Sequence, residues 1–203
     1  MDSTPASTAA ISTAPTSKWV VQGIDFRNLF WVALLFAAMI WAIYTPEYDW
    51  PLRFVHVASG VLLTGADIIM GFLIGPTLRM LDFPARRTFT LKLLPRTLFI
   101  FTPLGIVAPT SGWFYAERLG YTAMDYPDYW WIVGALVVSA ILAIQGLLIL
   151  LPSNIMAYLE MRKDQPDPAR VGRIMRRYFY TVASQGVMQV LIVTIMVKMA
   201  GGL

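Results

Sequence analysis

The 203-residue sequence contains no cysteine and a single histidine, His56. The lack of cysteine excludes disulfide bonds, thiolate metal sites, CxxC redox centres, covalent c-type haem attachment and cysteine nucleophiles. One imidazole cannot by itself supply a two- or three-histidine metal site, or both axial ligands of a bis-histidine haem. Many kinds of membrane redox protein are therefore disfavoured before any motif is considered.

Charge is also scarce, at 14% of residues, whereas 57% are hydrophobic and the mean hydropathy is +0.61. Soluble domains have about 25% charged residues. The apolar residues form five nearly uncharged runs, and a run of about 18 or more predicts a membrane span. This pattern excludes a soluble enzyme, a disordered chain and a coiled coil. It predicts an all-α polytopic membrane helix bundle with five transmembrane helices at about 28–44, 52–81, 97–115, 130–151 and 178–197.

The segments outside these runs are short of apolar residues. Residues 1–24 are rich in Ser, Thr, Ala and Pro, so we expect a disordered cytoplasmic tail without the features of a signal peptide, followed by a membrane domain over 25–203. Residues 82–96 and 163–177 are predicted to be basic loops, the first with an interfacial amphipathic helix. Pro103 and Pro109 are expected to kink or break the third span, and Pro152 to kink or end the fourth, with helix continuing to about Arg162.

Basic residues alternate across the predicted membrane. Of the sixteen Lys and Arg, thirteen fall in the tail and the connections after the second and fourth spans, and Arg53, Arg118 and Lys198 fall on the other side. Positive residues concentrate in cytoplasmic segments. We therefore expect a multi-pass protein of a bacterial inner membrane, with a cytoplasmic N-terminus and an outside C-terminus. Topology explains the net charge of +4 better than nucleic-acid binding, which we do not expect, although the basic loops could also bind anionic lipid head groups.

Asp67 is the main candidate for chemistry, because it lies near the middle of a predicted span. A carboxylate there is costly unless it is paired or hydrated. It is either a proton relay, a cation relay or a ligand anchor, or else it bonds a neighbouring span and holds the bundle together. The helical period places it on one small and polar stripe, which consists of His56, Gly60, Thr64, Asp67, Gly71 and Gly75.

Other members of this stripe have alternative roles. Gly60, Gly71 and Gly75 are expected to allow close helix packing. His56 is a candidate metal or haem ligand, a proton-exchanging group or an interfacial histidine. On the later spans, polar residues could donate to Asp67, bind a quinone or substrate carbonyl, or only join spans: Ser139, Gln145, Tyr178, Thr181, Gln185 and Gln189.

Three segments resemble a family of bacterial predicted integral membrane proteins, similar in turn to the membrane domain of copper-resistance protein D and to HemJ-type protoporphyrinogen oxidase. They are FVHVASGVLLTGADIIMGFLIGPTLR, LPRTLFIFTPLGIVAPTSGW and MRRYFYTVASQGVMQVLIVTIMVKM. The resemblance implies a small helical bundle with a histidine near one membrane face. In the better-known relatives such a histidine is associated with copper or haem, and here His56 alone has that position.

No Walker, HExxH or GxSxG motif occurs, so we predict no catalytic residue. The sequence favours a non-enzymatic component of a membrane electron-transfer complex that binds a small ligand (haem, quinone or metal) or another subunit. His56, Thr64, Asp67, Gln145, Gln185 and Gln189 would line its polar interior. The alternatives are a proton- or cation-coupled transporter that uses Asp67, and an oxidoreductase that uses haem b or quinone. Expected partners are the lipid bilayer and membrane or periplasmic redox subunits.

Overall fold

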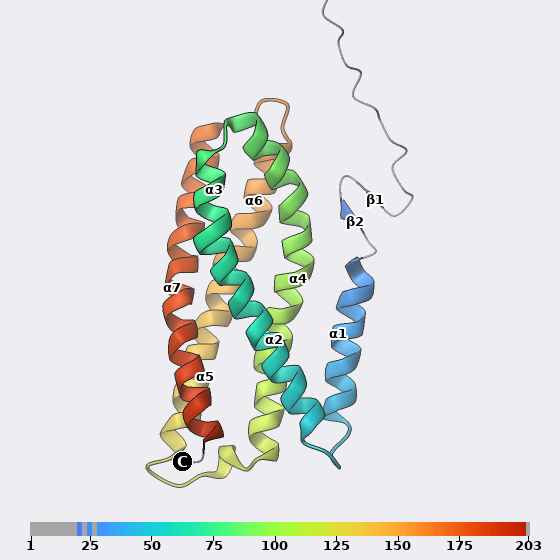
Figure 1. The fold of residues 1–203 in the computed structure, drawn as a ribbon, viewed down its shortest axis with the longest axis vertical. Helices are drawn as coiled ribbons and strands as arrows, with labels where there is room; N and C mark the ends of the chain where they lie inside the picture. Colours follow the sequence, from blue (N-terminus) through green and yellow to red (C-terminus); the bar gives the residue numbers. More distant parts are fainter. Residues whose placement is uncertain (1–19, 22–23, 26–27, 202–203) are drawn as a thin grey trace, which may run out of the picture.

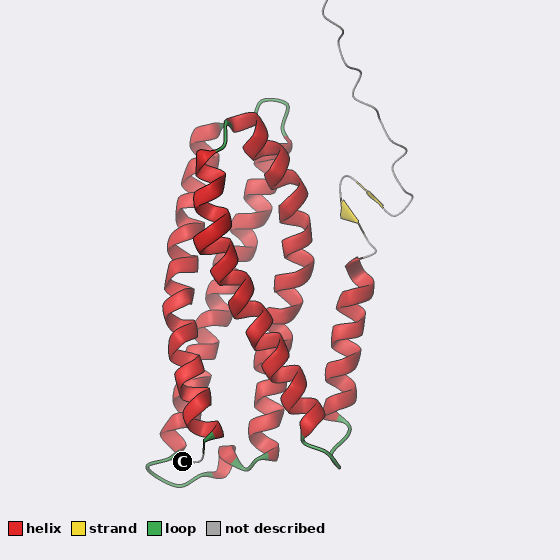
Figure 2. Cartoon of the chain, in the orientation of Figure 1, coloured by secondary structure: helices red, strands yellow, loops and turns green. Residues whose placement is uncertain are grey.

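The computed structural model describes residues 20–21, 24–25 and 28–201. The described chain is helical (Figures 1 and 2), apart from a two-residue antiparallel pairing of β1 (Val20–Val21) with β2 (Ile24–Asp25). The predicted all-α helix bundle is confirmed. The expected disorder of the N-terminal tail falls mostly on residues outside the described ones and stays a prediction.

Four helical rods in the described chain are long and apolar enough to cross a membrane. The first consists of α2 (Trp50–Ile68), the π-helical η1 (Ile69–Ile74) and α3 (Gly75–Met80), and the second is α4 (Phe83–Arg118). The third consists of α5 (Tyr129–Ile144), the π-helical η3 (Gln145–Leu150) and α6 (Leu151–Arg162), and the fourth is α7 (Pro168–Ala200). A short 3-10 helix, η2 (Tyr121–Ala123), lies between α4 and α5. The chain is thus an integral membrane protein with multiple spans.

The remaining apolar helix, α1 (Asn28–Ile43), has 16 residues. At about 1.5 Å per residue it is about 24 Å long, which is less than the ~30 Å hydrocarbon core of a bilayer. It lies beside α2 and α4 (Figure 1) and reaches only part of the length of the bundle. Whether α1 completes a fifth crossing therefore stays a prediction.

Two predicted loops are wrong because helices begin earlier than hydropathy indicates. Helix α4 contains nearly all of 82–96, with no separate interfacial helix, and α7 reduces the loop 163–177 to 163–167. The side chains of Asp82 and Asp167 accept hydrogen bonds from backbone N–H groups in the first turns of α4 and α7, at 3.3 and 2.8 Å. Each cap is followed by a proline at the first or second helical position, where no N–H is needed.

Prolines inside the rods do not interrupt them. Helix α4 runs continuously through Pro95, Pro103 and Pro109, so these prolines do not break the third span, and the kink expected at Pro103 and Pro109 stays a prediction. In the first and third rods the helix widens to π geometry just before Pro76 and Pro152, respectively. A π turn accommodates a residue that has no N–H to donate and whose ring crowds the preceding turn. The predicted continuation of the fourth span to Arg162 is confirmed.

The connections separate into two ends of the bundle (Figure 1). The α3–α4 and α6–α7 connections lie together at one end, which we call the basic end. The α1–α2 and α4–α5 connections and the C-terminus lie at the opposite end. The helix ends and loop at the basic end carry Arg79, Arg86, Arg87, Arg162, Lys163, Arg170, Arg173, Arg176 and Arg177. This segregation agrees with the charge pattern of the sequence, while the cytoplasmic assignment of the basic end stays a prediction.

Apolar clusters hold the helices together toward both ends of the bundle. Towards the opposite end, Ala116 on α4 packs with Ile132 and Ala135 on α5 and with Ile195 and Met199 on α7. Towards the basic end, side chains of α4, α6, α7 and η3 form two further clusters: Leu94, Ala157 and Tyr158, and Leu150, Tyr178 and Val182. A fourth cluster holds α1 against α2 and α4. The polar residues of the site lie between these clusters.

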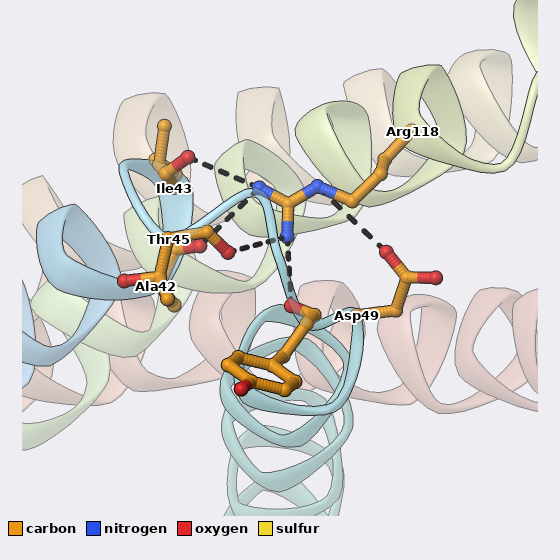
Figure 3. Close-up of polar contacts among 6 residues, drawn as sticks. Ala42, Ile43, Thr45, Asp49 and Arg118 are labelled. Atoms are coloured by element: carbon orange, nitrogen blue, oxygen red, sulfur yellow. Dashed lines mark hydrogen bonds and ion pairs between the residues drawn. The ribbon is translucent and has the colours of Figure 1, made fainter.

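Arg118, at the end of α4, ties the α1–α2 connection to the bundle (Figure 3). Its guanidinium donates to the carbonyls of Ile43 (3.0 Å), Tyr48 (3.1 Å), Thr45 (3.3 Å) and Ala42 (3.4 Å), and its Nε lies 3.9 Å from the Asp49 carboxylate. The last carbonyls of a helix have no partner within it. Arg118 therefore caps the last two carbonyls of α1, those of Ala42 and Ile43.

Candidate functional site

Asp67 lies one residue before the end of α2, and its side chain faces the interior of the bundle. The residue is 8% exposed, and its carboxylate accepts a hydrogen bond of 2.5 Å from the Nε2 amide of Gln189 on α7. The two residues are 122 positions apart in the sequence. A buried carboxylate needs such a donor, since a hydrogen bond to a charged group partly replaces lost hydration. The expected partner on a later span is therefore present, and it is Gln189.

His56 lies on the same rod, closer to the opposite end. Its Nδ1 lies 2.9 Å from the backbone carbonyl of Ala108 on α4. A carbonyl only accepts, so Nδ1 carries the proton, and in the neutral ring Nε2 is left as a hydrogen-bond acceptor. The ring packs on Gly112, where an added Cβ would lie 2.6 Å from the imidazole Cε1. Gly112 therefore makes room for the histidine between α2 and α4.

A cavity of about 690 Å³ connects these two residues, and we call it the inner cavity. Its volume is within the range of about 300–1,000 Å³ that is typical of small-molecule sites. Five of the predicted site residues line it: His56, Thr64, Asp67, Gln185 and Gln189. Most of the remaining wall is apolar and comes from the four long rods. The structure thus brings together residues that the sequence placed on separate spans.

The inner cavity reaches towards one end of the bundle only. Its lining extends to Arg53, Leu119 and Ala200 at the opposite end, whereas towards the basic end it stops at Asn154 and Tyr178. The cluster of Leu94, Ala157 and Tyr158 lies beyond that point, whereas Leu150 and Tyr178 of the other cluster form part of the cavity wall. The lining of the inner cavity therefore lies mainly between the middle of the bundle and the opposite end.

Unpaired polar atoms near the inner cavity are acceptors. Among the described residues, the side-chain oxygens of Gln189 and Asn154 are buried without a hydrogen-bond partner, and both residues line the cavity. Asn154 also shares a side-chain hydrogen bond with Tyr178. Pro109 has no N–H for the carbonyl of Gly105, another lining residue. The Asp67 carboxylate and His56 Nε2 are two further acceptors, and the same lining also carries donors such as Arg53 and Tyr115.

Two of the predicted polar residues join helices rather than leaving a free group in the cavity. Gln145 donates to the Ser184 hydroxyl at 3.2 Å and does not line the inner cavity. Gln185 does line it, but its amide donates to the backbone carbonyl of Leu142 at 3.2 Å.

Gln145 is also the first residue of η3, and η1 begins two residues after Asp67, so the two π-helical segments flank the polar region.

The three glycines of the stripe differ in their surroundings. An added Cβ at Gly71 would lie 3.1 Å from Val182, and one at Gly75 would lie 2.3 Å from the ring of Phe179, so α7 approaches both closely. At Gly60 an added Cβ would meet nothing within 4 Å. Gly60 lines the inner cavity instead, so its expected role in helix packing is wrong.

Asn154 and Gly112 are contributors to the site that sequence reasoning missed. Asn154 comes two residues after Pro152, in a segment that the sequence suggests is the end of the fourth span. Gly112 lies in the third span, between its two prolines and the aromatic residues at its end. Their position in the α6 and α4 helices gives each a place on the cavity wall. The signal that could have found Asn154 is that a polar side chain within a continuing apolar helix must face protein.

The residues present do not fit a metal site built from protein side chains alone. The described part of the chain contains no group of three His, Cys, Asp or Glu residues close enough to hold an ion. His56 offers one nitrogen, Nε2, because Nδ1 is bonded to Ala108. The copper role that the family resemblance implies for His56 therefore lacks its other ligands, and for a haem the described residues offer one imidazole nitrogen.

No protein-family model, curated protein or solved structure matches this chain. The resemblance expected from the three sequence segments therefore stays a prediction.

Proposed function

We propose that this integral membrane protein binds a small, mostly apolar molecule with hydroxyl donors, of the quinol class, in the inner cavity. The observation that carries the proposal is a group of acceptors from three helices at this cavity: the Asp67 carboxylate and His56 Nε2 on residues of its wall, and the buried side-chain oxygens of Gln189 and Asn154. Buried acceptors favour a ligand that donates hydrogen bonds. The apolar walls favour a ligand that enters from the bilayer.

Among the ligands expected from the sequence, a quinol meets this requirement better than a quinone. The two hydroxyls of a quinol donate hydrogen bonds, whereas the carbonyls of a quinone only accept them. Asp67 would anchor one hydroxyl, and His56 Nε2 provides a second acceptor on the same helix face. Quinols carry electrons and protons within membranes, so a protein that holds one would act as a component of an electron-transfer complex.

The test is a titration of the purified full-length protein in lipid nanodiscs with reduced and oxidised decyl-ubiquinone. We expect the reduced form to bind at least tenfold more tightly, which corresponds to about 1.4 kcal/mol. In Asp67→Asn, the preference for the reduced form should be lost, since the new amide donates where the carboxylate accepted. The matched control is Asp125→Asn, in an exposed residue of the α4–α5 connection that does not line the cavity.

Three results would contradict the proposal. They are equal affinity for the two forms, no binding of either form, and a reduced-form preference that persists in Asp67→Asn. A Soret band in the absorption spectrum of the purified protein would instead support haem as the ligand. Co-purification of other membrane or periplasmic subunits in mild detergent would support the electron-transfer component, and purification of the chain alone would count against it.

A proton- or cation-coupled transporter is the second candidate, because a lone carboxylate lies in a cavity that extends towards one membrane face. The lining counts against it, because it stops at Asn154 and Tyr178, and a path to the basic end would have to pass the cluster around Leu94. Flux into proteoliposomes distinguishes the two functions. A transporter predicts flux that Asp67→Asn abolishes, and the ligand-binding proposal predicts no flux in either protein.

A further inference from the structure

A second cavity, of about 640 Å³, lies at the basic end of the bundle, and we call it the end cavity. Its walls come from α3, the start of α4, the end of α6 and the first half of α7. Three arginines line it: Arg79 on α3, Arg86 on α4 and Arg176 on α7. Three of the four long rods thus each contribute one positive charge to the end cavity.

The positive charge of the end cavity is not neutralised by neighbouring acids. No ion pair joins Arg79, Arg86 or Arg176 to a carboxylate within the described residues. The buried carboxylate at this end, Glu160, is occupied by Lys163 at 2.7 Å and by Arg170 at 3.3 Å. The side chains of Asp82 and Asp167 cap the first turns of α4 and α7. The described residues therefore supply no carboxylate counter-charge to the three arginines of this cavity.

Two of the arginines are held in place without an anion. The Nη2 of Arg86 donates to the carbonyls of Arg79 (3.2 Å) and Leu81 (3.0 Å), which fixes the α3–α4 corner. Its Nε is buried and has no partner among the described residues. The guanidinium of Arg79 lies over the ring of Phe179, 4.7 Å from the centroid. A positioned fork of N–H donors is the group that proteins use to bind phosphate.

Apart from Thr90 and Tyr180, the other side chains that line the end cavity are apolar. Its walls include Leu78, Phe83, Met161, Met175, Phe179 and Ala183. It lies where the apolar rods meet the basic helix ends, which is the level of lipid head groups if the rods cross a bilayer. A free phosphate would use the arginines only, whereas a phospholipid would use both the arginines and the apolar wall.

We propose that the end cavity binds the phosphate group of an anionic phospholipid, with Arg79, Arg86 and Arg176 around the phosphate and an acyl chain against the wall formed by Phe179 and Ala183. This site is separate from the inner cavity and does not depend on the ligand proposed there. The alternative is that the arginines only set membrane orientation, which requires positive charge at this end but no particular arrangement of it.

The experiment titrates the full-length protein in mild detergent with three probes: dioctanoyl-phosphatidylglycerol, dioctanoyl-phosphatidylcholine and inorganic phosphate. Native mass spectrometry counts bound lipid, and calorimetry measures affinity. We expect phosphatidylglycerol to bind at least tenfold more tightly than either of the other probes. Phosphate binding as tight as phosphatidylglycerol binding would overturn the lipid as the ligand. The two lipids share the phosphate group but differ in net charge, so equal binding of both would overturn the preference for an anionic phospholipid.

A matched pair of double variants separates a built site from diffuse attraction. Arg79→Gln with Arg176→Gln removes two lining charges and should weaken phosphatidylglycerol binding at least tenfold. Arg173→Gln with Arg177→Gln removes the same charge from α7, from exposed residues that do not line the cavity, and should change binding less than twofold. Equal losses in the two variants would overturn the proposal. Arg86 is left intact because it holds the α3–α4 corner.

Discussion

The two cavities of this protein have similar volumes, about 690 and 640 Å³, but opposite chemistry. The inner cavity carries one carboxylate, that of Asp67, which is paired with Gln189 on the facing helix. The end cavity carries three arginines, none of them paired with a carboxylate in the described chain. The difference follows from depth, because a polar group in the hydrocarbon region must find a partner within the protein, whereas one at the surface can use water or a lipid head group. Polar contacts should therefore matter to the stability of the inner region and to ligand binding at the end cavity.

The largest effect on stability is expected for Gln189→Leu. The substitution removes the donor of the buried Asp67 carboxylate, and hydrogen bonds to charged groups contribute about 2–3 kcal/mol. Gln185→Leu is the matched control, because Gln185 is equally buried on the same helix but donates to a neutral carbonyl. Thermal unfolding in mild detergent should show a clearly larger loss for Gln189→Leu. Equal losses would mean that the charge of Asp67 is not what Gln189 stabilises.

Gly112→Ala is expected to have the next largest effect. The new methyl would lie 2.6 Å from the imidazole of His56, so the ring or the α2–α4 contact must shift, at a cost of about 1–3 kcal/mol. Gly60→Ala places the same methyl in open space on the inner cavity wall. Because alanine has the higher helix propensity, the free energy of unfolding should stay the same or rise by up to about 1 kcal/mol. Unfolding temperatures of the two variants check this difference. A stable Gly112→Ala protein with an unmoved His56 would contradict the packing described here.

Arg118→Gln should lower the free energy of unfolding by about 1–2 kcal/mol, because the variant loses charged donors to four carbonyls at the α1–α2 connection. Arg53→Gln removes the same charge at the same end, from an exposed side chain, and should change stability by less than about 0.5 kcal/mol. Limited proteolysis of the α1–α2 connection provides a second readout, and cleavage should increase in Arg118→Gln alone. Equal cleavage of the two variants would show that α1 is held by apolar packing rather than by Arg118.

The smallest effect on stability is expected at the end cavity. Arg79→Gln with Arg176→Gln should change the unfolding free energy by no more than about 0.5 kcal/mol, because both side chains are exposed and neither has a carboxylate partner in the described chain. The same variant should lose lipid binding, as stated above. A large loss of stability in lipid-free detergent would show that these arginines hold the fold together, and the contrast between the two cavities would then fail.

Much of the fold follows from local sequence patterns. Hydropathy placed the rods correctly, since apolar side chains must cover any helix that faces lipid. It failed at the basic ends of α4 and α7, where helices continue through charged residues outside the hydrocarbon region. The Asp-Phe-Pro and Asp-Pro sequences before these helices carry the capping signal that average hydropathy does not detect.

The site was predictable as a set of residues but not as an arrangement. The helical period put His56, Thr64 and Asp67 on one face, and all three line the inner cavity. The same period could not distinguish Gly60, which faces the cavity, from Gly71 and Gly75, which contact α7. Whether a glycine meets open space or a side chain depends on the neighbouring helix, and that information is not in the stripe itself.

The amino-acid sequence alone decided that this chain forms membrane-crossing helices, that their charged ends segregate, and that Asp67 needs a partner, because these properties depend on neighbouring residues and on the surrounding lipid and water. Tertiary packing decided that the partner is Gln189, that several acceptor oxygens are left without donors, and that three arginines share one hollow. Contacts between residues more than a hundred positions apart depend on how whole helices pack against one another. The periodicity of a single helix does not predict that packing.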